Sequence, residues 1–229
     1  MSGLCGWIGH GAGVADNRAM IETMAAPLAR FHGAPLHSLQ GRKSALGITA
    51  SAATAHVYQR DGLMVALWGV PGKAADGTDA AEALAQAWRR DPDAVCAGLT
   101  GSFSLCIVDD DAGEALLAID RMGVGNMAYQ VAGEALVFGS SADSIVRHPL
   151  TPSVLDHQGL YNYVYFHMIP GPGTVFQNQQ RLLPGEFLRY RQGRIEKRQY
   201  WRMKFDERPE RPFAELKQEF MQLLESGVR

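Results

Sequence analysis

The sequence predicts an α+β fold in which antiparallel sheets pack on each other and helices cover the outside. Three observations lead to this expectation. Short apolar or alternating segments bounded by Gly, Asp and Pro recur along most of the chain, as in antiparallel strands. The segments LMVALW at 63–68 and LCIVD at 105–109 are apolar almost throughout, which is typical of strands covered on both faces. Amphipathic helical patterns occur before, between and after the strands.

Elements in the first part of the chain follow from local patterns. Residues 4–11 form a short apolar segment ending in glycine, which predicts a buried strand. Asp16 can cap a helix whose apolar face contains Met20, Ile21, Met24, Ala25 and Leu28. The segment 31–43 contains Gly, Pro and Ser and is predicted to be a loop. Strands are expected at 44–50, 54–60 and 63–68, with an Asp61-Gly62 turn joining the last two into a hairpin.

The remaining elements alternate helices and strands. Thr78 or Asp79 can cap a helix with an apolar face made of Ala83, Leu84, Ala87 and Trp88. After Pro92 a meander of antiparallel strands is expected in SFSLCIVD, EALLAID, NMAYQVAG and EALVFGS. Helices at 141–147 and 156–166, the second capped by Asp156, precede two or three strands between 174 and 201. The last helix, from 213 onward, is amphipathic and needs a partner surface for Phe213, Leu216, Phe220, Leu223 and Leu224.

Composition excludes several classes of protein. The chain has 229 residues, 46% of them hydrophobic, and a formal net charge of -2, so no nucleic-acid partner is expected. Residues 189–211 hold nine Arg and Lys against four acids, and we interpret this as the charged solvent face of a strand pair. The three cysteines form no CxxC pair, which argues against a disulfide framework or a zinc site. We expect a cytoplasmic protein without a signal peptide or membrane helix.

Several segments, taken in order, resemble one family. LTGSFSLCIVD, DRMGVGNMAY and LVFGSSADS are similar to the asparagine synthetase succession Leu-x-Gly-x-Phe, Arg-Asp-Arg-x-Gly-x-Lys-Pro-Leu-Tyr-Tyr and Leu-x-Phe-x-Ser-Glu. The similarity continues through LDHQGLYNYVYFHMIPGPGTVF, RLLPGEFLRY and RIEKRQYW, and it includes the Cys-Gly-x-Ile-Gly start at Cys5. Because independent segments agree, the resemblance to the N-terminal glutaminase-type domain of asparagine synthetase-like proteins is specific.

The resemblance implies a fold, a reaction and a domain division. The fold is the N-terminal-nucleophile (Ntn) hydrolase sandwich, four layers in the order αββα. In class II glutamine amidotransferases an N-terminal cysteine releases ammonia from glutamine, and a second domain uses ATP and Mg²⁺ to form an amide. Residues 1–203 correspond to the glutaminase-type domain, 204–212 to a linker, and 213–229 to the first helix leading toward a synthetase domain. The phosphate-binding Ser-Gly-Gly-x-Asp-Ser motif does not occur in the sequence, so ATP and Mg²⁺ are expected only on that further domain.

Cys5 matches the nucleophile of the family. Such a cysteine uses its own free α-amine as general base, so activity requires cleavage of the Leu4–Cys5 bond. Its alternative interpretation is a buried core cysteine. In the family an Asn-Gly-Glu segment supplies oxyanion donors, and here Trp68-Gly69-Val70 stands in its place. Gly69 retains the backbone N–H, whereas Trp68 is expected to fill the pocket.

The glutamine pocket departs from the family at other positions. Thr49 lies where the family has an arginine that grips the substrate carboxylate, and a hydroxyl cannot replace that bidentate clamp. Asp79 matches the aspartate that receives the α-amine of glutamine, and an ordinary helix cap is its alternative interpretation. Gly125 replaces the lysine of Gly-x-Lys-Pro-Leu, and Ala142 replaces the glutamate of Ser-Glu. The neighbouring Asp120 and Arg121 are retained. They are interpreted either as functional residues of the family or as an ordinary ion pair beside a turn.

Three hypotheses remain from the sequence. The first is an active glutaminase domain that binds glutamine and supplies ammonia once Cys5 is exposed. The second is a catalytically degenerate scaffold of an ATP-dependent amide ligase, similar to beta-lactam synthetases and lasso-peptide cyclases, which do not use glutamine. The third is a stand-alone binding or assembly protein. In each case the helix at 213–225 is expected to contact a synthetase domain or a partner chain, and a homodimer is one such arrangement.

Overall fold

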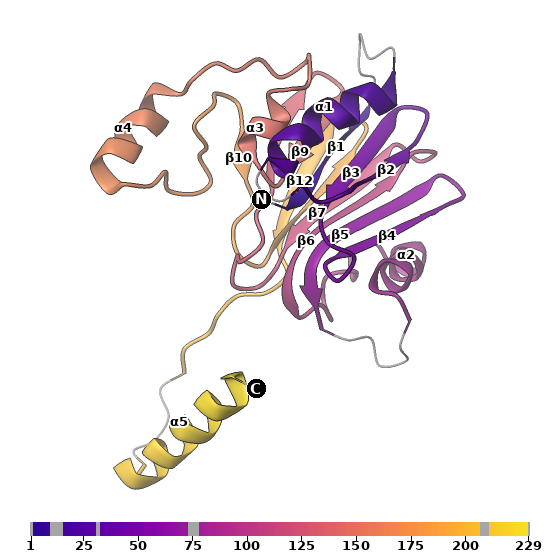
Figure 1. Ribbon diagram of the computed structural model, residues 1–229. Helices are drawn as coiled ribbons and strands as arrows, with labels where there is room; N and C mark the ends of the chain where they lie inside the picture. Colours follow the sequence, from indigo (N-terminus) through magenta and orange to yellow (C-terminus); the bar gives the residue numbers. More distant parts are fainter. Residues whose placement is uncertain (1, 10–15, 31–32, 73–77, 207–210, 229) are drawn as a thin grey trace.

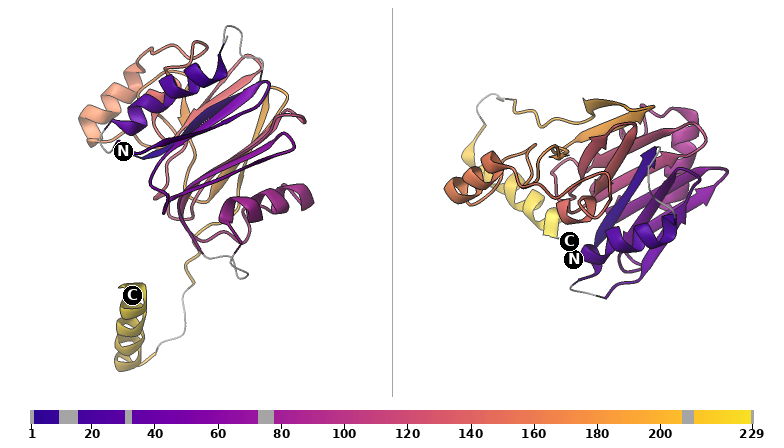
Figure 2. Two further views of the ribbon diagram at one scale, coloured as in Figure 1. Left: turned by 45° about the vertical axis from the view of Figure 1, so that its right-hand side comes forward. Right: turned by 90° about the horizontal axis from the view of Figure 1, so that it is seen from above.

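The structure is a computed structural model that describes residues 2–9, 16–30, 33–72, 78–206 and 211–228. In this part of the chain, two antiparallel sheets of six strands each face one another (Figures 1 and 2). In spatial order the first sheet contains β10 (Gln180–Arg181), β8 (Ala128–Ala132), β9 (Ala135–Gly139), β1 (Gly3–Gly9), β3 (Ser44–Thr49) and β2 (Leu36–Gln40). The second sheet contains β12 (Arg194–Gln199), β11 (Glu186–Arg191), β7 (Glu114–Ile119), β6 (Gly101–Asp109), β5 (Leu63–Pro71) and β4 (Ala55–Arg60).

Helices cover the outer faces of both sheets. The helices α1 (Asn17–Ala29) and α3 (Ala142–Ile145) pack on the first sheet, and α2 (Ala80–Arg90) packs on the second (Figure 2). The layers therefore follow the order helix, sheet, sheet, helix, and the predicted α+β fold is confirmed.

Aspartate side chains begin the predicted helices. Asp16 accepts hydrogen bonds from the N–H groups of Arg18 and Ala19 at the start of α1. Asp79, rather than Thr78, caps α2. Asp156 caps α4 (His157–Phe166) through the N–H of Gly159. These caps are confirmed. In each one, a short carboxylate side chain accepts hydrogen bonds from backbone N–H groups that have no partner within the helix.

Strand β1 lies inside the first sheet and is covered on both faces. Because side chains alternate along a strand, Leu4 and Ile8 join the core between the sheets, whereas Cys5 and Trp7 join the core beneath α1 and α3. All four side chains are at most 1% exposed. The predicted buried strand is thus confirmed for the described residues, and residues 10 and 11 lie outside them.

Two details of the predicted strand order are wrong. The segment predicted as a loop at 31–43 contains β2, an edge strand paired with β3. Gly33 and Pro35 precede the strand and Gly41 follows it, and backbone pairing with β3 stabilises a segment with only a weak apolar pattern. The predicted meander after Pro92 is also divided, because β6 and β7 belong to the second sheet and β8 and β9 to the first. The chain changes sheets at the turn that follows Asp120.

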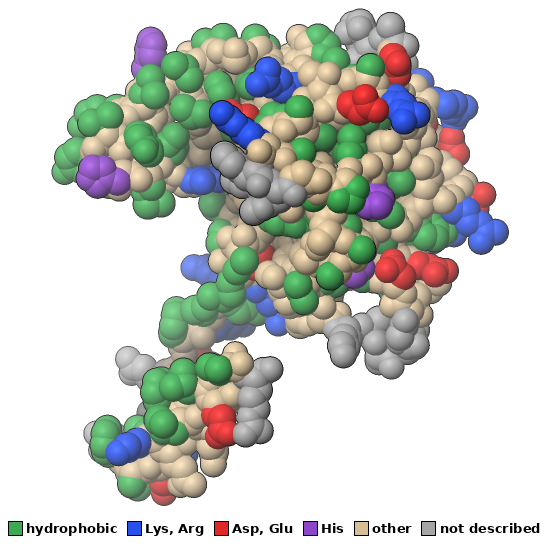
Figure 3. All heavy atoms as spheres, in the orientation of Figure 1, with side chains coloured by type: hydrophobic (Ala, Val, Ile, Leu, Met, Phe, Trp, Pro, Cys, Tyr) green, Lys and Arg blue, Asp and Glu red, His purple; other side chains and the backbone are tan. Residues whose placement is uncertain are grey.

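The last two helices are exposed. Helix α4 projects from the sandwich and buries only Gly159, while α5 (Phe213–Val228) buries no residue and lies apart from the sheets (Figure 1). Figure 3 shows apolar side chains over both helices. The exposed large apolar residues on and beside α4 are Val154, Leu155, Leu160, Tyr161, Tyr163, Val164, Tyr165, Phe166 and Met168. Among the described helices, none has the length and apolar character needed to span a membrane.

Candidate functional site

Cys5 is enclosed in the middle of β1. It pairs with Gly47 of β3 on one side and with Gly139 of β9 on the other. Its side chain is 0% exposed and packs in the core beneath α1, which contains Met24 and Ala25. Burial raises the pKa of the thiol well above its ordinary value, because the apolar surroundings disfavour the thiolate. Cys5 in this state is a core residue and a poor nucleophile.

The peptide bond that precedes Cys5 is also held inside the sheet. The N–H of Leu4 donates to Ser140 Oγ over 3.0 Å, and the N–H of Ser140 donates to the Leu4 carbonyl over 2.8 Å. Leu4 is 0% exposed and pairs with Ile48 in the β1–β3 ladder. Cleavage of the Leu4–Cys5 bond would require β1 to leave this ladder, since a protease binds its substrate as an accessible, extended segment.

Gly69 is needed for the shape of β5. Its φ is +135°, in a region that residues with a side chain rarely adopt, and an added Cβ would lie 2.2 Å from the carbonyl oxygen of Ser102. Its N–H donates to the carbonyl of Thr54 over 2.9 Å. The backbone N–H expected to stabilise an oxyanion therefore already donates a hydrogen bond to a backbone carbonyl.

Trp68 borders a small cavity beside Gly69. The indole packs against the core between the sheets, as expected for a side chain that fills the pocket. The cavity has a volume of about 100 Å³ and is lined by Trp68, Gly69, Ser102, Phe103, Val124 and Gly125. Sites for small organic ligands usually have about 300–1,000 Å³. This cavity is therefore smaller than a typical substrate pocket.

The wall formed by Gly125 depends on Asp120. This carboxylate is 1% exposed and accepts hydrogen bonds from the N–H groups of Phe103, Met122, Val124 and Gly125. The resulting turn brings Gly125 so close to β6 that an added Cβ would lie 2.1 Å from the Phe103 carbonyl oxygen. The expected ion pair with Arg121 is not found among the described residues. Instead, the Arg121 guanidinium lies 5.9 Å from the Trp201 ring centroid.

The other candidate substrate residues lie on different layers. Thr49 is 0% exposed, and its Oγ1 has no hydrogen-bond partner within the described chain. It pairs with Gly3 and faces the same side of the first sheet as Cys5. Asp79 begins α2 on the far side of the second sheet, where Oδ1 accepts from the Ala81 N–H and Oδ2 lies 3.3 Å from His56 Nδ1. Neither residue lines the cavity at Trp68, so the structure does not assemble the five predicted site residues into one pocket.

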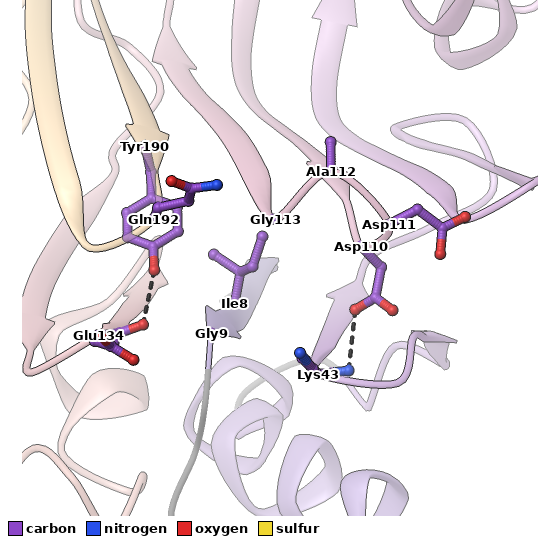
Figure 4. Close-up of a pocket in the computed structure, with 10 residues that line it drawn as sticks. All are labelled: Ile8, Gly9, Lys43, Asp110, Asp111, Ala112, Gly113, Glu134, Tyr190 and Gln192. Atoms are coloured by element: carbon purple, nitrogen blue, oxygen red, sulfur yellow. Dashed lines mark hydrogen bonds between the residues drawn. The ribbon is translucent and has the colours of Figure 1, made fainter.

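A larger cavity, which the sequence patterns did not indicate, lies at the end of the sandwich where β1 finishes. It has a volume of about 510 Å³ and contains polar groups from Lys43, Asp110, Asp111, Glu134, Tyr190 and Gln192 (Figure 4). The Tyr190 hydroxyl donates to the Glu134 carbonyl over 2.7 Å. The sequence around this cavity predicts only an Asp-rich turn at 109–111 between two antiparallel strands.

Asp110 in this cavity holds two turns together. Its carboxylate accepts hydrogen bonds from the N–H groups of Arg42 and Lys43 and from the Ser44 hydroxyl. Desolvation raises the pKa of Asp110, but the hydrogen bonds from Ser44, Lys43 and Arg42 lower it by a larger amount. The pKa therefore lies below its usual value. Within the described residues, no group of three acidic, His or Cys side chains could hold a metal ion.

Comparison with known proteins agrees with the fold described above. The glutamine amidotransferase domain family matches residues 54–201. A glutamine phosphoribosylpyrophosphate amidotransferase from B. subtilis, solved with ADP and GMP, is similar in structure with a TM-score of 0.51 and 15% identity over 87% of this chain and 49% of that chain. An allosteric regulatory enzyme of purine biosynthesis gives a TM-score of 0.52 and 14% identity over the same shares of the two chains. No curated protein matches the sequence.

At these identities the solved structures support the fold alone, which is that of Ntn-type glutamine amidotransferase domains. The chain spans about half the length of these two enzymes. The family match covers well over half of the present sequence and includes β4 to β12. The chain therefore belongs to the glutamine amidotransferase domain family.

Proposed function

We propose that this domain is a catalytically degenerate scaffold of an asparagine synthetase-like, ATP-dependent amide ligase, and that it does not hydrolyse glutamine. The observation that carries the proposal is the position of Cys5 in the interior of β1, with Leu4 hydrogen-bonded to Ser140 before it. A class II nucleophile needs a free α-amine beside its thiol as the general base. In this structure the Cys5 nitrogen is a peptide nitrogen within the sheet.

The remaining machinery supports the same proposal. Glutamine hydrolysis passes through a tetrahedral intermediate, and loss of one oxyanion donor typically lowers the rate about a hundred- to a thousandfold. Here Trp68 replaces the asparagine donor, and the Gly69 N–H is bonded to Thr54. The thiol, the tryptophan and Asp79 also occupy different layers of the fold. The domain retains the architecture of a glutaminase without a joined active site.

We infer that the retained role is to support a second domain that carries the ATP and Mg²⁺ chemistry. The described residues provide no three-ligand metal cluster and the sequence contains no Ser-Gly-Gly-x-Asp-Ser motif, so this part of the chain is not fitted to hold either group. Helices α4 and α5 offer the contact surface, because both expose large apolar side chains to solvent (Figure 3). Exposed apolar patches of this kind commonly mark interfaces.

The decisive experiment joins intact mass and N-terminal sequencing to an ammonia-release assay with glutamine. We expect a chain that retains Leu4 and releases no ammonia above the blank, with Cys5→Ala giving the same result. A chain that begins at Cys5 and hydrolyses glutamine, with loss of that activity in Cys5→Ala, would overturn the proposal. That outcome would establish the alternative, an active glutaminase that supplies ammonia to the ligase.

A further inference from the structure

The outer face of the β11–β12 hairpin contains a groove of about 700 Å³ that the glutaminase fold does not explain. Its lining is strongly charged and includes four arginines. The lining residues are Asp93, Arg189, Arg191, Gln192, Arg194, Ile195, Glu196 and Arg198. The volume lies in the range of small-ligand sites.

Strand register brings three of these arginines together. Arg189 of β11 stands directly opposite Glu196 of β12, so Arg194 and Arg198 are its two diagonal neighbours. Side chains two residues apart on β12 point to the same face, and diagonal neighbours lie within reach of long side chains. The hairpin therefore places a triangle of guanidinium groups around one glutamate.

Arg189 is held firmly at the base of the groove. It is 8% exposed, its guanidinium lies 5.4 Å from the Trp88 ring centroid, and it donates to Asp93 and to Glu114. Its Nε is buried and has no hydrogen-bond acceptor among the described residues. A fixed guanidinium loses little conformational freedom when it binds a planar or tetrahedral oxyanion.

The charges of the groove do not balance. Four arginines face three carboxylates, those of Asp93, Glu114 and Glu196. Arg189, Arg191 and Arg198 each form an ion pair with a carboxylate, whereas Arg194 has none within the described part of the chain. Glu196 bonds Arg198 over 2.7 Å and is half exposed to solvent or more, so it competes with any incoming anion.

We propose that this groove binds a small oxyanion, a phosphate or carboxylate group, between the guanidinium groups of Arg189, Arg194 and Arg198. The unpaired Arg194 supplies free donors, and Arg189 adds a fixed positive charge at the base of the groove. An excess of one positive charge suits a small anion, whereas a nucleic acid needs several phosphate contacts for measurable affinity. This proposal is independent of whether the domain hydrolyses glutamine.

Calorimetric titration of the full chain with inorganic phosphate at low ionic strength tests the proposal. We expect saturable binding that weakens with salt, about fivefold weaker affinity in Arg194→Gln, and stronger affinity in Glu196→Gln, which removes a competing negative charge. Arg60→Gln is the matched control, because Arg60 is an exposed, ion-paired arginine on the other edge strand of the same sheet. Arg194 has no ion pair within the described chain, so Arg194→Gln is expected to keep the fold, which circular dichroism checks.

Parallel titrations with acetate and citrate distinguish a carboxylate ligand from a phosphate. Preference for phosphate over both carboxylates would assign the groove to a phosphorylated compound, and the reverse preference to an organic acid. Absence of saturable binding for all three anions would overturn the proposal. So would equal loss of affinity in Arg60→Gln and Arg194→Gln, or weaker binding in Glu196→Gln.

Discussion

Leu4 and Ser140 form a reciprocal pair of hydrogen bonds, one to the serine hydroxyl and one from the serine N–H. This pair lies immediately before Cys5 and continues the contact between β1 and β9 beyond the last paired residue, Cys5 with Gly139. Residues that an active class II enzyme would remove are therefore part of the sheet. Cleavage of the Leu4–Cys5 bond would therefore remove a contact that holds β1 in the first sheet.

Ser140→Ala should lower the free energy of unfolding by about 1–3 kcal/mol, because the buried N–H of Leu4 loses its acceptor. Urea denaturation measures the change. Ser51→Ala is the control, since that serine is exposed and its hydroxyl bonds only Thr54 nearby, so a change within about 0.5 kcal/mol is expected. Equal effects of the two substitutions would show that the Leu4 contact contributes nothing to stability.

Gly125→Ala should destabilise the domain by about 1–3 kcal/mol or more, because the new methyl group collides with the Phe103 carbonyl and the turn held by Asp120 must open. A lysine, the residue of the asparagine synthetase pattern that resembles this segment, would meet the same obstacle. Gly98→Ala is the matched control, as nothing lies within 4 Å of its added Cβ. Thermal unfolding compares the two, and a stable Gly125→Ala variant would contradict the close approach.

Much of the architecture could be predicted because its signals are local. The apolar segments at 63–68 and 105–109 became central strands, and Asp16, Asp79 and Asp156 became helix caps. The failures concern pairing between distant segments. The edge strand at 36–40 forms by backbone pairing with β3. The division of strands between the sheets follows from the buried turn at Asp120. The four backbone hydrogen bonds to this carboxylate leave no periodic pattern in the sequence.

The candidate site shows the same limit more clearly. Alternation along β1 could place Cys5 inside, but only the structure shows that Leu4 is bonded to Ser140, 136 residues away. Likewise, the family resemblance predicted an oxyanion donor at Gly69 from its position alone. Its N–H bond to Thr54 and its φ of +135° explain the glycine by backbone geometry instead.

Trp68→Asn introduces the residue of the asparagine synthetase pattern and should still release no ammonia from glutamine. The side-chain amide would return one donor, but the Gly69 N–H stays bonded to Thr54 and the Cys5 thiol stays buried and protonated. A coupled ammonia assay measures the activity, with Trp68→Phe as the control that keeps an aromatic ring in the cavity. Ammonia release by Trp68→Asn that disappears on adding Cys5→Ala would contradict this expectation.

His148 should make the domain less stable as the pH falls from about 6.5 to 4. It is 1% exposed, its ring centroid lies 5.3 Å from that of Trp7, and burial lowers its pKa to about 4. In the unfolded chain this histidine has its ordinary pKa of about 6.5 and takes up a proton in this range, whereas in the folded chain it stays neutral. The free energy of unfolding therefore falls by up to about 1.4 kcal/mol per pH unit, and His148 adds no further change below pH 4.

Urea denaturation of His148→Asn across the same pH range isolates this contribution. Asparagine can still accept the Leu150 N–H that bonds His148 Nδ1, but it does not titrate. The pKa values of Asp93 and Asp110 are lowered, so the stability that these carboxylates contribute is lost below about pH 5. This loss is the same in the wild type and the variant, and it cancels when their free energies of unfolding are subtracted. His37→Asn, the same substitution at an exposed position on β2, is the control. A slope unchanged in His148→Asn would show that the pKa of His148 is the same in the folded and unfolded chains, and it would contradict this prediction.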